Sequence, residues 1–312
     1  MNNVLEIENL SKEYETGFWK KKKVRALDDL TLGVRAGQIF GFLGGNGAGK
    51  TTTIKILMSL LFPSSGSARI LGRSISEPAM HSRIGYCPEN PYFYDYLTAR
   101  ELMNYFGELF GMSSAARKKR TEELLAAVGL DEKDWDKQLR KFSKGMLQRV
   151  GLAQSLINDP EIVFMDEPMS GLDPIGRREV RELIAGLRAK GTTVFMSTHI
   201  LSDVEALCDE VAILRKGKLA ASGKLEDLLA SEDKHRSFEI QFRGISGDEL
   251  ESVLASVATL SISGNAGSAT VQVPDESNIE NVIRLTRSAG GTLISVNSVK
   301  QSLEDLFVRE TA

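Results

Sequence analysis

The sequence predicts an α/β protein with a parallel β-sheet core, a helical insert, and a smaller α+β domain at its C-terminal end. Three observations lead to this prediction. Apolar runs of strand length alternate with amphipathic helical segments. Residues 91–142 show helical periodicity alone. From residue 237 onwards the order changes to βαββαβ, which is typical of a ferredoxin-like domain. The length of 312 residues fits two domains, at roughly 150 residues each.

The N-terminal part of the chain predicts three strands and a helix. Residues 4–14 and 24–34 are strand-like, and a turn-rich joint at residues 17–23 separates them. Residues 38–43 form a short apolar run of strand length. Residues 51–61 follow with apolar side chains at helical spacing, so we expect a helix directly after this buried strand.

A capping box marks the start of the helical insert. Thr98 and Glu101 have the spacing at which the two side chains accept hydrogen bonds from each other's backbone N–H groups at a helix N-terminus. After the insert, residues 161–165 and 192–196 predict two further strands, separated by a helix that Gly191 closes. Because strands joined through helices pair in parallel, these strands should extend the core sheet.

The polar residues 231–236 are predicted to link the two domains. The first domain is expected at residues 1–230, with its helical part at about 91–160, and the second at residues 236–312. In the second domain, strands are expected at residues 238–242, 260–263, 269–273 and 292–296, and helices at residues 248–255, 279–288 and 302–308.

Composition argues against several classes of protein. Lys and Arg number 39 against 42 Asp and Glu, a net charge of −3, so bulk nucleic-acid binding is not expected. The longest apolar runs fall far short of the ~18 residues that span a bilayer, and the N-terminus is acidic where a signal peptide has an apolar run. Two cysteines without CxxC spacing and three scattered histidines argue against a zinc site. We expect a soluble cytoplasmic protein.

A glycine-rich loop between the first buried strand and its helix fits the pattern G-x-x-x-x-G-K-[ST]. Its backbone N–H groups can turn around phosphate oxygens, and the following helix N-terminus adds partial positive charge. Lys50 can reach the β- and γ-phosphates, and the Thr51 hydroxyl can ligate Mg²⁺. The predicted nucleotide-binding residues here are Gly44, Gly45, Asn46, Gly47, Ala48, Gly49, Lys50, Thr51 and Thr52.

Two adjacent acids, Asp166 and Glu167, follow the apolar run at residues 161–165. Carboxylates at the end of a buried strand are costly unless they meet a cation or a substrate proton. Asp166 is therefore predicted to hold Mg²⁺, and Glu167 to polarise the attacking water as general base, a role worth about 10²–10⁴-fold in rate. A solvated acidic turn is the alternative, and the glycine-rich loop weighs against it.

Together these residues resemble the ATP-binding subunits of ATP-binding-cassette (ABC) transporters, over residues 1 to about 230. The resemblance implies the P-loop ABC ATPase fold, which has an antiparallel β subdomain beside its parallel core. Residues 142–146 (Phe-Ser-Lys-Gly-Met) are similar to that family's signature, usually Leu-Ser-Gly-Gly-Gln. The resemblance implies that Ser143 and Gly145 contact ATP bound to the opposite subunit, and that Asp173 lies in a loop coupling the two sites. Ser143 is also a good helix cap, so its helix N-terminus can face an anion.

The same resemblance assigns three further residues. His199 would contact the γ-phosphate and act in catalysis with Glu167 and Lys50. Tyr14 would lie under the adenine ring. Glu89 stands where many relatives have a glutamine that ligates Mg²⁺ and water. Plainer interpretations stay open at this point, with His199 as a structural histidine and Tyr14 as an edge-strand aromatic.

Departures from the family pattern point to one subgroup. Glu89, the Lys144 and Met146 of the signature, and the C-terminal segment 302–307 (Ser-Leu-Glu-Asp-Leu-Phe) are similar to the cassettes of ABC-2-type exporters. The resemblance implies ATP and Mg²⁺ as cofactors and a homodimer or paired ATPase subunit. It also implies separate integral membrane permease subunits, which would hold the chain at the inner face of the cell membrane. Tyr92, Phe93, Tyr94 and Tyr96 would contact the permease, and the plainer interpretation of clustered aromatics as core residues stays open.

The expected activity is therefore ATP hydrolysis that powers export. One alternative is an ABC ATPase that drives a non-transport membrane complex, or that acts in translation or DNA repair. A regulatory nucleotide binder without turnover is a further alternative, and it conflicts with the retained Glu167.

Overall fold

The computed structural model describes residues 3–16, 22–230, 237–259, 261–265 and 267–299. The chain divides into two compact units, the first ending at Leu225 and the second beginning at Glu226, and each is described by itself. The joint at residues 17–21, the linker at 231–236 and the helix expected at 302–308 lie outside the described residues. The domain limits 1–230 and 236–312 therefore stay predictions.

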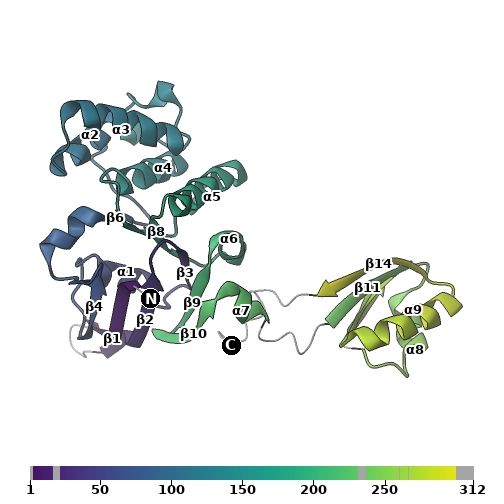
Figure 1. Ribbon diagram of the computed structural model, residues 1–312. Helices are drawn as coiled ribbons and strands as arrows, with labels where there is room; N and C mark the ends of the chain where they lie inside the picture. The colour runs from purple at the N-terminus through teal and green to yellow at the C-terminus, as the bar shows by residue number, and fades with distance from the viewer. Residues whose placement is uncertain (1–2, 17–21, 231–236, 260, 266, 300–312) are drawn as a thin grey trace. The chain divides into compact units, whose positions relative to one another are not determined.

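The first unit is built around a six-stranded sheet with the strand order β10-β9-β3-β8-β7-β6 (Figure 1). Neighbouring strands from β9 to β6 pair in parallel, and β10 pairs antiparallel with β9. The parallel core that the sequence predicts is thus confirmed. The strands are β3 (Ile39–Gly44), β6 (Ile84–Cys87), β7 (Ile162–Asp166), β8 (Thr193–Thr198), β9 (Glu210–Arg215) and β10 (Lys218–Lys224).

A second, antiparallel sheet has the order β2-β1-β4-β5 and covers one side of this core. Its strands are β1 (Asn3–Thr16), β2 (Lys22–Arg35), β4 (Ser65–Ile70) and β5 (Arg73–Ser74). Helix α1 (Lys50–Leu57) packs into the same hydrophobic cluster, beside the stacked rings of Phe40 and Phe195. Helix α5 (Pro174–Ala189) packs against β8 and β3, and helix α6 (Leu201–Leu207) packs against β8.

Helix α1 is shorter than the sequence predicts, because it ends at Leu57 and not at residue 61. Ser59 takes a φ of 56°, a left-handed conformation that breaks the helical path. The Leu60 N–H bonds back to Lys55 O (2.9 Å), which closes the helix end, and the Leu60 side chain is 64% exposed. Leu60 therefore faces solvent, whereas Leu61 is partly buried and packs against the hydrophobic core from the segment after the helix.

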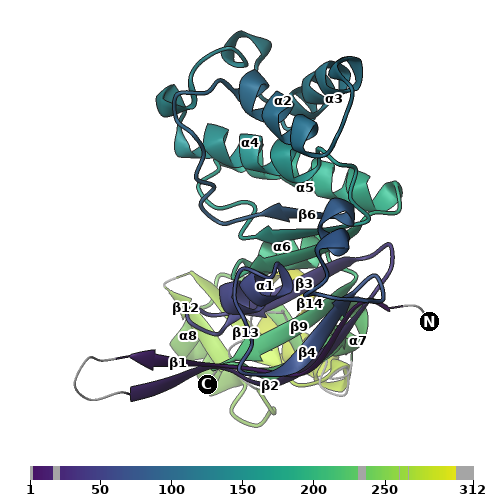
Figure 2. The same ribbon diagram turned by 90° about the vertical axis from the view of Figure 1, so that its left-hand side faces the viewer.

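Helices α2 (Ala99–Leu109), α3 (Ser114–Ala127) and α4 (Lys144–Ser155) gather at one end of the first unit, far from the antiparallel sheet (Figures 1 and 2). The capping box at Thr98 and Glu101 is confirmed by both of its hydrogen bonds. Short 3₁₀ turns lie at Pro78–Arg83, Glu132–Asp134 and Leu139–Lys141. None of the helices in the described ranges combines the length and the apolar character that crossing a bilayer requires.

The second unit has the βαββαβ order that the sequence predicts. After α7 (Leu225–Ala230), its elements are β11 (Ser237–Arg243), α8 (Gly247–Val253), β12 (Ser261–Asn265), β13 (Ser268–Val273), the 3₁₀ turn Glu276–Asn278, α9 (Ile279–Ser288) and β14 (Thr292–Val299). The sheet order is β12-β13-β11-β14, with antiparallel neighbours throughout. Ile240, Phe242 and Val271 pack with Leu250 and Val282 in a hydrophobic core of its own.

Candidate nucleotide-binding site

The glycine-rich loop joins β3 to α1 in a conformation that requires glycine. Gly47 and Gly49 have φ values of 77° and 112°, left-handed values that glycine adopts without penalty. A Cβ built on Gly49 would lie 2.6 Å from the Ala26 carbonyl oxygen and 2.8 Å from a methyl group of Leu27. The loop therefore lies directly against β2, and any side chain at position 49 would force the two apart.

The backbone of this loop leaves N–H donors without partners inside the chain. The Ala48 N–H donates to Gly45 O (3.1 Å). In the part of the chain that the structure describes, the N–H groups of residues 46, 47, 49, 50 and 51 donate no hydrogen bond. Unpaired N–H donors that meet at a helix N-terminus are suited to binding anions. The loop thus presents the donors that a phosphate group requires.

Three predicted catalytic residues lie together beside this loop, and we call Lys50, Glu167 and His199 the Glu167 cluster. Lys50 Nζ donates to Gly44 O (2.7 Å) and lies 3.4 Å from Glu167 Oε1. The same Oε1 is 2.9 Å from His199 Nδ1. Lys50 and Glu167 are buried, whereas the His199 side chain is 54% exposed. A buried carboxylate is thus held between a cation and an imidazole that faces solvent.

The Glu167 cluster forms because parallel strands end at one edge of the sheet. β8 lies between β3 and β7, and Asp166 at the end of β7 pairs with Ser197 of β8. The glycine-rich loop leaves the same end of β3, opposite Thr198. In open α/β sheets, ligands bind in the crevice at the carboxyl ends of the strands. The sheet therefore brings together residues that are far apart in the sequence.

The backbone of Glu167 is strained, and its neighbours fix it. Its φ is 48°, a left-handed value that costs a non-glycine residue about 1–2 kcal/mol. The Glu167 N–H donates to Ser197 O (3.1 Å), and the Glu167 carbonyl accepts from the Ser170 N–H (3.0 Å). Such strain persists only where surrounding bonds hold it, and it is typical of functional sites. Sequence analysis missed Ser197, whose one signal was a hydroxyl near the end of a buried strand.

Asp166 is 1% exposed and accepts a hydrogen bond from the Ser197 hydroxyl. Burial, with a smaller contribution from the Asp166 charge, raises the pKa of Tyr86 to about 12 and that of Cys87 to about 12. Both side chains are therefore neutral at pH 7. The Cys87 thiol is therefore not a nucleophile at pH 7, because the thiolate is its reactive form.

The donor set at this edge fits Mg²⁺. Asp166 offers a carboxylate oxygen and Thr51 a hydroxyl oxygen, which are the hard ligands that Mg²⁺ prefers. Glu89 is half-buried and lies just beyond β6, the strand next to β7. Within the described ranges, His, Cys, Asp and Glu form no group of three placed to hold a metal ion. Phosphate and water oxygens would have to complete the coordination.

The predicted signature residues lie at the N-terminus of α4, apart from the Glu167 cluster. Ser143 is exposed and caps the helix, accepting from the N–H three residues on (3.2 Å). A Cβ on Gly145 would lie 3.4 Å from Gly171 O, so this helix end packs on the loop before α5. Asp173 caps α5 by the same kind of bond (3.0 Å). Among the described residues, no hydrogen bond or ion pair joins Ser143 or Asp173 to the Glu167 cluster.

Tyr14 lies near the end of β1, opposite Val24 of β2. Its side chain is 36% exposed, and Lys12 Nζ lies 5.3 Å from the centre of its ring. A cation at this distance from a ring face is attracted to it. Tyr14 therefore has one ring face near a cation and enough exposure to meet a ligand.

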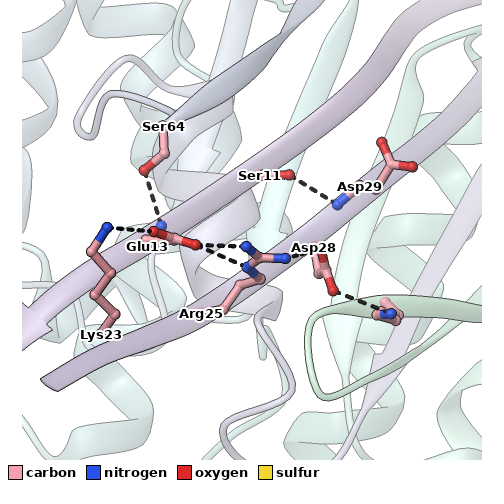
Figure 3. Close-up of polar contacts among 8 residues, drawn as sticks. Ser11, Glu13, Lys23, Arg25, Asp28, Asp29 and Ser64 are labelled. Atoms are coloured by element: carbon pink, nitrogen blue, oxygen red, sulfur yellow. Dashed lines mark hydrogen bonds and ion pairs between the residues drawn. The ribbon is translucent and has the colours of Figure 1, made fainter.

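An ion-pair network ties the strands around Tyr14 to the core sheet (Figure 3). Arg25 donates to Glu13 (2.7 and 3.0 Å) and to Asp28 (2.8 Å), and Lys218 Nζ of β10 lies 3.2 Å from Asp28. The Arg25 guanidinium holds the pKa of Glu13 below its usual range. The hydrogen bond from Lys218, and then Arg25, does the same for the pKa of Asp28.

The turn between β9 and β10 supports the glycine-rich loop through backbone hydrogen bonds, which the sequence did not predict. The Gly217 N–H, in the β9–β10 turn, donates to Ala48 O (2.9 Å), and the Gly217 carbonyl accepts from the Asp28 N–H (2.9 Å). Lys216 and Gly217 have φ values of 48° and 83°. The dipeptide Lys-Gly is a weak signal for this turn. Its contact with the loop depends on tertiary structure, which the sequence pattern does not carry.

Two of the aromatic residues predicted to contact a permease lie beside a groove of about 380 Å³. Tyr92 and Phe93 line it together with Phe106 and Phe110 of the helical end. Tyr92 is 97% exposed. Exposed aromatic side chains around a groove are typical of protein interfaces.

Comparisons with known proteins point to one family. The family described as "ABC transporter" matches residues 27–170. An uncharacterized ABC transporter ATP-binding protein of Synechocystis sp. is 45% identical over 99% of this chain and 84% of its own length. The bacitracin transport ATP-binding protein of Enterococcus faecalis is 33% identical over 98% of this chain and 96% of its own. The Nod factor export ATP-binding protein I of Ralstonia nicotianae is 37% identical over 73% of this chain and 70% of its own.

Solved structures are similar to about seven-tenths of this chain. One is a dimeric ATP-binding cassette in a post-hydrolysis state, bound to ADP and phosphate. It superposes with a TM-score of 0.66 and 25% identity, over 71% of this chain and 98% of its own.

Proposed function

Because this chain belongs to the family of ABC transporter ATP-binding proteins, we propose that it hydrolyses ATP as a nucleotide-dependent dimer and thereby powers export through separate permease subunits. The Glu167 cluster beside a loop of unpaired N–H donors is the observation that carries the hydrolytic part of this proposal. The coarser statement, that the chain is an ABC ATPase subunit, follows from its family.

In the proposed mechanism, the loop N–H groups and Lys50 bind the β- and γ-phosphates. Lys50 lies 3.4 Å from Glu167 Oε1, so a γ-phosphate that attracts Lys50 releases the carboxyl group from its contact with the lysine. Glu167 then takes a proton from the attacking water, and His199 orients the Glu167 carboxyl through the 2.9 Å contact. Mg²⁺ would be held by Thr51, Asp166 and Glu89, where it would neutralise phosphate charge.

The dimer in this proposal completes each site with the signature of the other chain. Ser143 and Lys144 are exposed at a helix N-terminus and have no bond to their own chain's Glu167 cluster among the described residues. A capped helix N-terminus with an adjacent lysine can bind the γ-phosphate of a facing chain. Asp173, at the start of α5, would lie at the same interface, and Tyr14 would contact the adenine.

The permease part of the proposal rests on two supports. The apolar groove beside Tyr92 can receive a short segment of a membrane partner. The Ralstonia relative is a Nod factor export ATP-binding protein by name. The alternative, a cassette acting on a non-transport, ribosomal or DNA repair complex, predicts a different partner. Co-purification of the chain from its native membranes with a polytopic protein supports transport, and recovery with ribosomes or DNA supports a role in translation or DNA repair.

Subunit mixing tests the composite site. Lys50→Ala and Ser143→Arg should each lose hydrolysis, and mixing the two proteins should restore part of it, because a mixed dimer has one intact site. Ser113→Arg is the matched control, since Ser113 is likewise an exposed helix cap, on α3, outside the signature. Assayed without a second variant, Ser113→Arg should hydrolyse ATP at the wild-type rate. Failure of the mixture to recover activity, with both proteins folded, would contradict a composite site.

A further inference from the structure

Helix α4 carries a buried amide that no proposed catalytic step uses. Gln148 is fully buried. Its Nε2 donates to Pro168 O (3.3 Å) and lies 3.8 Å from Cys87 Sγ. Pro168 directly follows Glu167, and Cys87 ends the strand that leads to Glu89. One side chain of the signature helix therefore contacts both loops that carry predicted active-site carboxylates.

The orientation of this amide leaves an unpaired acceptor. A carbonyl oxygen only accepts hydrogen bonds, so the Pro168 carbonyl fixes which end of the amide is Nε2. Gln148 Oε1 then has no hydrogen-bond partner in the described part of the chain. An unpaired buried acceptor lowers stability, and an apolar side chain of similar size would avoid that loss. The amide donates a hydrogen bond to the Pro168 carbonyl, which an apolar side chain could not do. This bond is therefore the reason to have glutamine at position 148.

We propose that Gln148 is a positioning residue for Glu167, which it holds through the backbone of Pro168. Glu167 has a left-handed φ that its neighbours must maintain. Ser197 fixes the N-terminal side of Glu167, and Gln148 fixes the residue on its C-terminal side. The inference deepens the proposed function, because it rests on Glu167 acting as the general base.

The place of Gln148 on α4 gives this bond a second consequence. The cap of the same helix is Ser143, which would contact the nucleotide of the partner subunit. A Cβ on Gly151 would lie 3.1 Å from the Pro91 ring, so the helix also packs tightly on the loop after Glu89. Gln148 therefore links the helix that would meet the partner's nucleotide to the loop that carries Glu167.

The test removes the amide and keeps its volume. Gln148→Met should lower kcat about tenfold, because a misaimed base costs rate, while KM for ATP stays within about twofold. The matched control is Thr121→Val on α3. The Thr121 hydroxyl is likewise buried and unpaired among the described residues, but it contacts neither loop through a hydrogen bond. Thr121→Val should leave kcat and KM unchanged. If Met is not accommodated, Gln148→Asn should show the same loss of kcat, since its amide is too short to reach Pro168.

A double-variant cycle asks whether Gln148 acts through Glu167. In the Glu167→Gln background, Gln148→Met should change the residual hydrolysis by less than about twofold, because the group it positions is already gone. A further tenfold loss there, or a wild-type kcat in folded Gln148→Met, overturns the proposal. Absence of hydrolysis in the wild-type protein would instead refute the proposed function, so the two failures are distinguishable.

Discussion

Glu167 combines a strained backbone with a carboxyl group that contacts two cationic or protonatable side chains. Removing one partner of a buried ion pair leaves an uncompensated charge, which destabilises a protein more than the intact pair stabilises it. When a nucleotide binds, a phosphate group can replace the Glu167 carboxylate as the partner of Lys50. The Lys50–Glu167 contact is therefore better explained by nucleotide binding than by stability. Stability alone gives little reason to bury this pair.

The Cys87 thiol gives a prediction at the scale of one residue. Burial raises its pKa to about 12 in the folded protein, so the folded state keeps a proton that the unfolded chain loses near pH 8.5. This contribution to stability is complete below about pH 8.5 and is lost as the pH rises toward 12. Between those values the free energy of unfolding should fall by about 1.4 kcal/mol per pH unit more steeply in the wild type than in Cys87→Ala. Urea unfolding at pH 8, 9 and 10 measures the slopes, and parallel slopes would contradict the assignment.

Residues at strand ends were predictable, and residues that support them were not. The glycine-rich loop and the acid pair after a buried strand were enough to predict Lys50 and Glu167 as site residues, and the family resemblance added His199. Ser197 and Gln148 could not be found in this way. Their contacts depend on strand register and on helix packing, which local periodicity does not determine.

The β9–β10 turn acts as an element that braces the nucleotide loop, and Gly217 tests it. A Cβ there would lie 2.7 Å from Ala26 O, at a φ of 83°. Gly217→Ala should lower the free energy of unfolding by more than the ~1–2 kcal/mol of a left-handed alanine and should weaken ATP binding. Gly72→Ala is the control, because Gly72 has a φ of 75° and nothing within 4 Å of its Cβ position.

In Gly72→Ala the free energy of unfolding should fall only by the ~1–2 kcal/mol of a left-handed alanine, and the affinity for ATP should stay at the wild-type value. Chemical denaturation of both variants measures the loss of stability that backbone strain causes. ATP titration measures whether the turn supports the nucleotide loop. Equal affinities for ATP in the two variants would show that the turn does not support the loop.

Among the elements, the helix after the glycine-rich loop shows where sequence patterns fail. Its predicted end at residue 61 followed the apolar spacing, whereas the left-handed Ser59 ends it at Leu57. Leu60 lines a groove and Leu61 packs against the core, so both follow the helical spacing although neither belongs to the helix. The capping box at Thr98, by contrast, predicted the start of α2 correctly, because its two hydrogen bonds are local to the helix end.

At the scale of the whole molecule, the C-terminal unit has its own hydrophobic core and contains none of the phosphate-binding residues. A chain ending at Lys234 should therefore fold and bind ATP within about twofold of the wild-type affinity, since no predicted contact to the nucleotide is removed. The full chain should differ from it in dimer stability or in its response to the permease. Loss of ATP binding in a folded truncated chain would contradict the division of function between the units.

The central claim is that two chains enclose two ATP molecules and that Glu167 activates the water in each site. The Glu167→Gln variant tests it most directly, since the amide keeps the size of the side chain and cannot take the proton. With Mg²⁺ and ATP, this variant should elute as a dimer in size-exclusion chromatography, retain two unhydrolysed ATP molecules, and turn over at least about 10²-fold more slowly than the wild type. A monomer that hydrolyses ATP at the wild-type rate would contradict the account.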